Sequence, residues 1–148
     1  MKAPLERIFS TAADLSRWPH ILPHYRWIKY RQQSPGRNVV VMAAWRQVPS
    51  LAGLKIPIRW TSEQQIDESG KEIRFLHLKS FSKGMSVVWT FTPASEGFNV
   101  CITHDFTSGI PIIGLLFIEP IVGRFIAHFV ADQTLAKMKD YVESQRAA

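Results

Sequence analysis

An alternation of apolar and polar residues from 25 to 107 constrains the fold of this chain more than any other feature. A period of two residues is that of a β-strand with one buried face. Clusters of Gly, Pro and Ser interrupt the alternation and predict loops between successive strands. The predicted loops lie at residues 34–36, 50–53, 68–71, 82–84 and 94–97. The sequence therefore predicts six antiparallel strands.

The last three loops set the pairing of the strands that they join. The first of the three places Ser62 opposite His77 and Lys79 opposite Trp60. The second places His77 opposite Trp89, and the third places Trp89 opposite Ile102. A slip of one residue would turn every side chain of a strand to the opposite face. All three pairings nevertheless agree on which face is apolar. They predict a sheet with one buried face and one wet face.

The last third of the chain predicts one long helix over residues 120–145, with Pro120 at its first position. Such a helix would be about 39 Å long and would not be stable alone. Its apolar stripe comprises Ile121, Phe125, Ala131, Leu135, Met138 and Val142, with Arg124 and His128 in the middle. The sheet is the surface that can cover this stripe. The predicted fold class is α+β, with a curved antiparallel sheet wrapped around the C-terminal helix.

The N-terminal segment and the composition complete this prediction. Residues 4–13 predict a first helix, and Asp14 can cap a second short helix that ends at Trp18. The length of 148 residues suits a single domain, 1–148. One cysteine, Cys101, excludes an internal disulfide and fits a reducing compartment. No secretory signal and no membrane span are visible, so we expect a cytoplasmic protein.

Polar side chains on the predicted apolar face mark a candidate site, because a buried polar group needs a partner or a ligand. Aromatic side chains surround them, which is typical of a small-molecule cavity. The predicted cavity residues are Trp60, Ser62, Phe75, His77, Lys79, Phe81, Val87, Trp89, Phe91, Ile102, His104, Phe106, Arg124, Phe125 and His128. Either histidine could instead be a hydrogen-bonded core residue, and Lys79 could be a cation–π partner of Trp60 at the rim.

Familiar catalytic motifs are absent from the sequence. Cys101 and His104 are three apart on one predicted strand, so they point to opposite faces and cannot form a thiol–imidazole pair. His20 and His24 have helical spacing, but Pro23 lies between them and no carboxylate completes a zinc site. We expect no metal and no cofactor. His77 and His104 are the candidate catalytic residues, since imidazole can act as a general acid or base near neutral pH.

Several short motifs resemble the SRPBCC superfamily, which includes START-type lipid-binding proteins. They are the segments Ala3-Pro4-Leu5-Glu6-Arg7-Ile8-Phe9, Ala13-Asp14-Leu15, Trp18-Pro19, Leu22-Pro23-His24-Tyr25, Gly84-Met85-Ser86-Val87-Val88-Trp89-Thr90-Phe91 and Thr134-Leu135-Ala136-Lys137-Met138-Lys139. Within the superfamily the chain looks most like the polyketide cyclase/dehydrase and coenzyme Q-binding groups. The resemblance implies a helix-grip fold with seven strands and a deep hydrophobic cavity. Family members usually have a strand before the first helix, where this chain offers only residues 1–3, so the strand is either a stub or begins upstream.

Three functions fit the sequence. The first is a binder or carrier of a hydrophobic small molecule, such as a quinone, isoprenoid, lipid or aromatic polyketide, without catalysis. The second is an aromatase/cyclase or dehydratase that uses the cavity histidines. The third is an interaction protein, in which Val122, Ile126 and Phe129 contact a membrane surface or a second copy, or in which the basic residues 26–37 bind ribosomal or other RNA. The scattered charges that make up the net +6 argue against nucleic acid as a partner.

Overall fold

The computed structural model describes residues 1–48, 54–80, 82–105 and 128–145 of the chain, which contain three helices and six strands. The strands form one antiparallel sheet in sequence order. The elements are α1 (Leu5–Ala13), α2 (Trp18–Ile21), β1 (Tyr25–Ser34), β2 (Arg37–Val48), β3 (Leu54–Asp67), β4 (Glu72–Lys79), β5 (Ser86–Pro93), β6 (Phe98–Asp105) and α4 (His128–Ser144).

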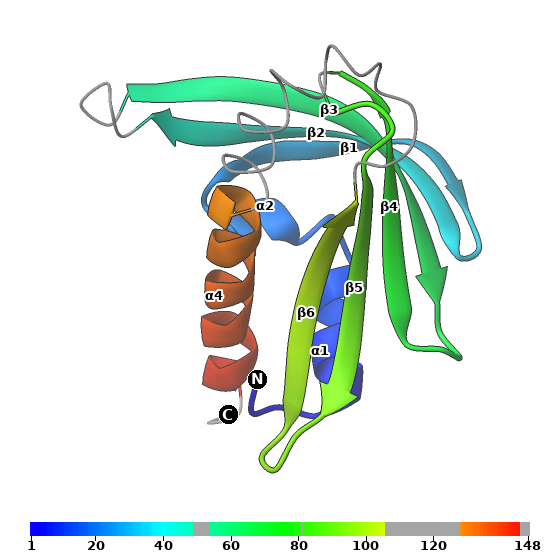
Figure 1. Cartoon of the computed structure of the whole chain (residues 1–148), viewed down its shortest axis with the longest axis vertical. Coiled ribbons are helices and arrows are strands. Elements are labelled where there is room, and N and C mark those ends of the chain that lie inside the picture. The colour runs from blue at the N-terminus through cyan, green and yellow to red at the C-terminus, as the bar shows by residue number, and fades with distance from the viewer. Residues whose placement is uncertain (49–53, 81, 106–127, 146–148) are drawn as a thin grey trace.

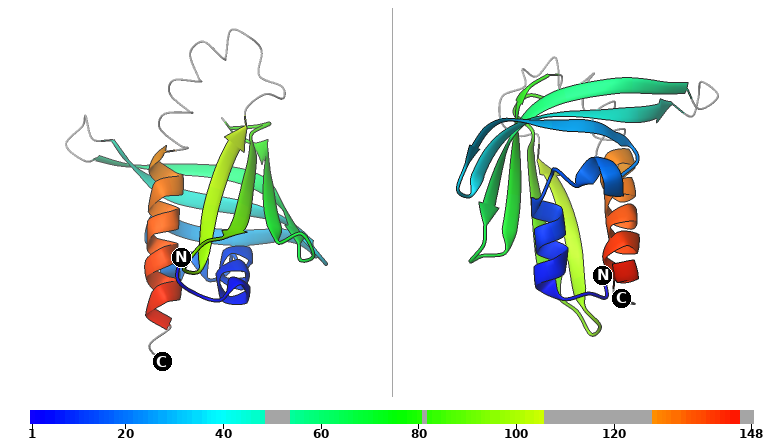
Figure 2. Two further views of the ribbon diagram at one scale, coloured as in Figure 1. Left: turned by 60° about the horizontal axis from the view of Figure 1, so that its bottom comes forward. Right: turned by 180° about the vertical axis from the view of Figure 1, so that it is seen from behind.

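The sheet curls so that β1–β3 and β4–β6 form two walls, with α4 beside the inner face (Figure 1). α1 and α2 lie on the same inner side, and the N-terminus lies near the last turns of α4 (Figure 2). The Lys2 backbone N–H donates to Glu143 Oε1 at 2.7 Å, which ties the two ends together. This is the predicted α+β arrangement, a helix-grip fold, in which the curved sheet buries one face of the C-terminal helix.

Two of the predicted hairpin pairings are confirmed. Ser62 pairs with His77 across β3 and β4, and Trp89 pairs with Ile102 across β5 and β6. The inward residues of these strands include Ile73, which is fully buried, as the alternation requires. The loop positions read from the sequence therefore predicted these two strand registers correctly.

The predicted pairing between β4 and β5 is wrong: it differs from the observed register by four residues. Phe75 pairs with Val87, and the His77 N–H donates to the Met85 carbonyl at 2.9 Å. The loop between β4 and β5 is therefore longer than the predicted three residues. It is closed by a second hydrogen bond, from the Gly84 N–H to the His77 carbonyl, and Gly84 has a φ of +89°, which glycine adopts without strain. An even shift leaves every side chain on its predicted face.

The predicted pairing of Lys79 with Trp60 is also wrong. The register shifts between Thr61 and Ser62, and Lys79 pairs with Thr61. Leu78 is the extra, unpaired residue of this β-bulge. Because of it, Lys79 does not face the same side of the sheet as His77, two residues earlier. Lys79 is exposed as a result and does not lie among the buried side chains.

α4 confirms the predicted stripe where it is described. Ala131, Met138 and Val142 are buried and Leu135 is half-buried. Val130, which is not among the predicted stripe residues, is buried as well, because α4 contacts α1 and α2 in addition to facing the sheet. Pro120, Val122, Arg124, Phe125 and Ile126 lie outside the described residues, as do Phe81 and Phe106, and only the backbone of His128 and Phe129 is described.

The second helix begins where we expected it to end. α2 starts at Trp18, and Asp14 instead accepts a hydrogen bond from the Ser16 N–H at 3.1 Å. An aspartate that closes a turn on its own backbone competes with the helix that it could otherwise cap. This places the Trp18 side chain in the interior, with only 2% of its surface exposed.

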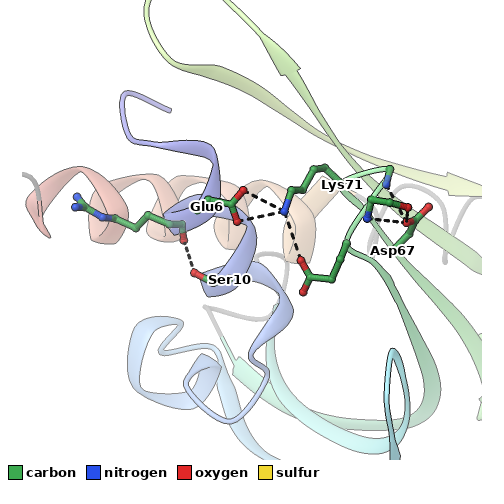
Figure 3. Close-up of polar contacts among 8 residues, drawn as sticks. Glu6, Ser10, Asp67 and Lys71 are labelled. Atoms are coloured by element: carbon green, nitrogen blue, oxygen red, sulfur yellow. Dashed lines mark hydrogen bonds and ion pairs between the residues drawn. The ribbon is translucent and has the colours of Figure 1, made fainter.

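α1 packs on the lower part of the sheet and is held there by apolar and charged contacts. The Phe9 ring meets the Phe91 ring edge-on at 5.5 Å. Lys71 Nζ lies 3.1 Å from Glu6 Oε1, and Asp67 accepts hydrogen bonds that close the neighbouring turn (Figure 3). The ammonium also lies 4.8 Å from the Phe9 ring centroid. These contacts close one end of the space beneath the sheet.

Met1 makes two backbone hydrogen bonds with Phe98, at the start of β6. The Met1 amino group donates to the Phe98 carbonyl at 2.6 Å, and the Phe98 N–H donates back to the Met1 carbonyl at 2.9 Å. Exchange of both hydrogen bonds is the pairing of neighbouring antiparallel strands. A side chain at Gly97 would collide with the Met1 backbone, since a Cβ there would lie 2.2 Å from the Met1 carbonyl oxygen.

Candidate functional site

A cavity of about 60 Å³ lies between the inner face of the sheet, α2 and the first turns of α4. Its described walls carry no Lys, Arg, Asp or Glu side chain. The lining residues are Trp18, Tyr25, Met42, Ile58, Trp60, Phe75, His77, Ser82, Met85, Val87, Trp89, Ile102, His104, Val130, Ala131 and Thr134. A concave, mostly apolar space with a few polar groups is the usual form of a small-molecule site.

Trp18 is the centre of the aromatic wall of this cavity. Its ring centroid lies 5.2 Å from Tyr25, 6.1 Å from Phe75 and 5.7 Å from Trp89. The indole N–H donates to the Thr11 carbonyl at 3.3 Å, which satisfies its one polar atom. Such edge-on and tilted pairs add to the stability that burial alone provides.

His77 forms the first polar corner of the cavity. Its Nδ1 lies 2.6 Å from Ser82 Oγ, and its ring stacks on Trp60 with centroids 5.9 Å apart. Burial, and to a lesser extent the nearby His104, lowers the pKa of His77 from 6.5 to about 3. The imidazole is therefore neutral at physiological pH, and it presents a hydrogen-bonding group without a charge.

We expect Ser82→Ala to lower the free energy of unfolding by about 1–2 kcal/mol, because the buried Nδ1 of His77 would lose its partner. Ser82 is 1% exposed, so water does not readily replace the hydroxyl. Chemical denaturation measures the change. Ser95→Ala in the exposed loop before β6 is the matched control, and equal stability of the two variants would contradict the assignment.

Tyr25, Thr134 and His24 form the second polar corner. Thr134 Oγ1 lies 3.0 Å from His24 Nε2. Burial lowers the pKa of His24 to about 4. Burial also raises the pKa of Tyr25, and a hydrogen bond with Thr134 opposes that rise in part. All three groups are therefore neutral near pH 7.

Seven of the residues predicted for the cavity line it. They come from β3 to β6, on the face that the alternation identified. They are Trp60, Phe75, His77, Val87, Trp89, Ile102 and His104. His77 and His104, the two candidate catalytic residues, therefore lie on the same cavity.

Three others do not line the cavity. Lys79 is turned outward by the bulge in β4. Phe91 packs against Phe9 below the cavity. Ser62 is fully buried behind the wall, and its hydroxyl has no hydrogen-bond partner among the described residues. Phe81, Phe106, Arg124, Phe125 and the side chain of His128 lie outside the described residues.

The residues that α2 and β1 contribute were not predicted to line the cavity. Tyr25 was not assigned to a face, because both faces of the first hairpin hold large apolar residues. Trp18 was predicted only as the end of a short helix, which assigns it no neighbours in the sheet. Thr134 could have been found, since it lies three residues after Ala131 and four before Met138 on the predicted stripe. His24 could not, because its role depends on contact with α4, 110 residues away in the chain.

The described residues were also compared with the requirements of a metal site and of a membrane-spanning helix. No three His, Cys, Asp or Glu side chains among them gather closely enough to hold a metal ion. None of the helices in the described ranges is long and apolar enough to cross a bilayer.

Comparisons with known proteins agree with this architecture. The family model described as "Polyketide cyclase / dehydrase and lipid transport" matches residues 1–135. No curated protein matches the chain. Among solved structures, TTHA0849 from Thermus thermophilus is 23% identical with a TM-score of 0.75, and the match covers 98% of this chain and 93% of that one.

Two further structures share the fold at lower identity. The Zhui aromatase/cyclase from Streptomyces sp. R1128 is 20% identical with a TM-score of 0.70, and the match covers 96% of this chain and 88% of that one. A STAR-related lipid transfer protein from Xanthomonas axonopodis is 10% identical with a TM-score of 0.57, covering 97% of this chain and 81% of that one. At these identities the likeness shows the fold alone.

Proposed function

Because the chain belongs to the polyketide cyclase/dehydrase and lipid transport family, we propose that its cavity binds a hydrophobic small molecule of the polyketide or lipid class. The observation that carries this proposal is a cavity with aromatic walls and two uncharged polar corners, at His77 and at Tyr25 with Thr134. Apolar walls bind the body of a ligand, and the few polar groups orient it.

The volume of the cavity limits which part of a ligand can enter it. About 60 Å³ is small beside the roughly 300–1,000 Å³ of pockets that enclose a drug-sized molecule. We therefore expect one ring or one head group to lie among the described residues. Burying about 100 Å² of apolar ligand surface would contribute about 2.5 kcal/mol before the costs of binding, so hydrogen bonds at the polar corners matter for affinity.

The histidines favour binding over catalysis in this proposal. A general base is most effective when its pKa is near the working pH. The pKa of His77 is lowered to about 3, which leaves a weak base suited to accepting or donating a hydrogen bond. The second candidate function, an aromatase/cyclase or dehydratase, is supported by the position of His104 on the same cavity and by the family. Loss of turnover with retained binding in His104→Gln would favour that second function.

Native mass spectrometry of the protein purified from its own host tests the proposal. We expect a co-purifying hydrophobic compound, and we expect Ala131→Phe to reduce its retention about tenfold by filling the cavity from α4. Lys139→Phe, on the exposed side of the same helix, is the matched control and should retain the compound. Absence of any adduct, together with no binding of the bicyclic hydrocarbon indane by calorimetry, would contradict the proposed function.

A further inference from the structure

The strands β2 and β3 continue past the end of β1 and project from the sheet (Figure 1). The pairing of β1 with β2 ends at Tyr25, opposite Ala44, whereas β2 and β3 stay paired as far as Val48 and Leu54. The projecting part, residues 45–48 and 54–57, is here called the arm. A two-stranded ribbon is barely stable by itself in water, so the arm gains stability from any surface that covers it.

The arm exposes large aliphatic side chains. Leu54 is 56% exposed and Ile56 is 40% exposed. They are two residues apart on β3 and therefore share one face of the strand. Ile58, the next residue on that face, is half-buried and lines the cavity, so exposure rises from the cavity toward the arm. Neighbouring exposed apolar side chains mark a contact surface, whereas single ones do not.

Positive charge is concentrated in the same part of the sheet. Residues 24–62 contain seven basic side chains and no Asp or Glu. The rest of the chain holds eleven basic and twelve acidic residues, so this segment accounts for the whole positive excess. The seven charges are spaced along the sequence, but β1, β2 and β3 are neighbours and bring them into one wall. They are Arg26, Lys29, Arg31, Arg37, Arg46, Lys55 and Arg59.

These cations are available to a negatively charged partner. Six of the seven have described side chains, and all six are exposed. Within the described part of the chain, only Arg37 of the six forms an ion pair, with Glu63 at 2.7 Å. The Arg26 guanidinium lies 4.3 Å from the centroid of the Trp45 ring. A cation–π contact of this kind leaves the positive charge in place, so the wall attracts anions.

A groove of about 270 Å³ at the base of the arm can receive an anionic group. Trp45 and Lys55 line it from the arm, Lys137 lines it from α4, and its described walls hold no Asp or Glu. The Lys137 ammonium lies 3.8 Å from Asp140 on its own helix, so Lys55 is the stronger candidate to meet an anion. Tryptophan and lysine together are typical of the boundary between lipid head groups and acyl chains.

The exposed aliphatic side chains decide between the partners that a basic wall attracts. A second copy of the chain would bring seven more cations and would be repelled. A nucleic acid would neutralise the charge, but its bases stack on aromatic rings and would leave Leu54 and Ile56 in water. A membrane with anionic lipids suits both features, because its head groups attract the cations and its acyl boundary takes up the aliphatic side chains. A projecting arm can enter such a fluid layer without a shaped pocket.

We propose that the arm docks the protein on the surface of a membrane that contains anionic lipids. Leu54 and Ile56 enter the boundary between head groups and acyl chains, and the basic side chains of β1, β2 and β3 lie against the head groups. This inference goes beyond the proposed function, which concerns the cavity and does not require a membrane.

Sedimentation with lipid vesicles tests the inference on the unaltered chain. We expect binding to phosphatidylcholine vesicles that contain about 30% phosphatidylglycerol to be at least about tenfold tighter than binding to phosphatidylcholine alone, in about 0.1 M NaCl. Raising the salt to about 0.5 M should remove most of this difference, because screening shortens the reach of the charges. Equal binding to the two kinds of vesicle would overturn the inference.

The aliphatic contribution is tested by Leu54→Ser combined with Ile56→Ser. We expect this double variant to bind the anionic vesicles about tenfold more weakly, since both side chains would no longer leave water on docking. Leu76→Ser is the matched control, because Leu76 is 41% exposed but lies on β4, away from the arm. It should bind like the unaltered protein, and an equal loss in the two proteins would contradict docking through the arm.

The charge contribution is tested by Lys55→Gln combined with Arg59→Gln. We expect binding to the anionic vesicles to weaken by about 30-fold, at about fivefold for each basic residue near the membrane surface. Lys83→Gln combined with Lys139→Gln removes the same charge from exposed positions outside β1, β2 and β3 and should have a much smaller effect. Equal losses would show that net charge alone drives binding.

Two further measurements separate the alternatives. Binding of a single-stranded RNA oligonucleotide that depends on Lys55 and Arg59, without any binding to vesicles, would overturn the inference and identify the wall as a nucleic-acid surface. Calorimetry with indane on the same variants should give unchanged affinity, because none of the substituted residues lines the cavity. Failure of docking with retained indane binding therefore leaves the proposed function intact.

Discussion

Trp18→Ala is expected to lower the free energy of unfolding by about 3–5 kcal/mol, the usual cost of deleting a buried large aromatic side chain. Trp18 is 2% exposed and touches the rings of Tyr25, Phe75 and Trp89. Its removal would also enlarge the cavity that it lines, so the surrounding rings could relax only in part. Urea denaturation of the two proteins measures the difference.

Trp27→Ala is the control for this prediction. Trp27 is half-buried and its ring lies 5.3 Å from the Lys29 ammonium, away from the cavity. Loss of that contact should cost about 1 kcal/mol at most. Equal losses in the two variants would mean that the aromatic cluster around Trp18 does not organise the interior.

Acidification from about pH 8 to about pH 5 is expected to lower the free energy of unfolding by about 4 kcal/mol, because two buried histidines stay neutral in the folded state. Their pKa values are lowered by burial to about 4 for His24 and to about 3 for His77. In the unfolded chain, imidazole takes up a proton as the pH falls through about 6.5. The unfolded state therefore binds more protons between pH 6.5 and these folded-state values, and stability falls over that window.

Chemical denaturation at a series of pH values measures this slope. The double variant His24→Gln, His77→Gln should have a much flatter profile between about pH 8 and about pH 5. His20→Gln, which alters an exposed histidine, should leave the slope unchanged. A double variant as pH-sensitive as the unaltered protein would show that the imidazoles are not kept neutral by burial.

Local sequence signals predicted those parts of the site that regular strands present. Trp60, Phe75, His77, Val87 and Trp89 all line the cavity, since the two-residue period assigns each strand residue to a face. The error of four residues between β4 and β5 did not disturb this, because the shift was even. The bulge at Leu78 was different, since a single extra residue is invisible to periodicity and moved Lys79 to the outside.

Periodicity and turn chemistry, which act over a few residues, were enough to predict the layers of the fold: which segments are strands, which face of β3 to β6 is buried, and that the final helix must be covered. The composition of the cavity wall could not be predicted in this way, because Trp18, Tyr25 and Thr134 come together from α2, β1 and α4, and His24 is positioned by its contact with Thr134. The chemical character of the site depends on those long-range contacts, since only burial by distant segments keeps its histidines neutral.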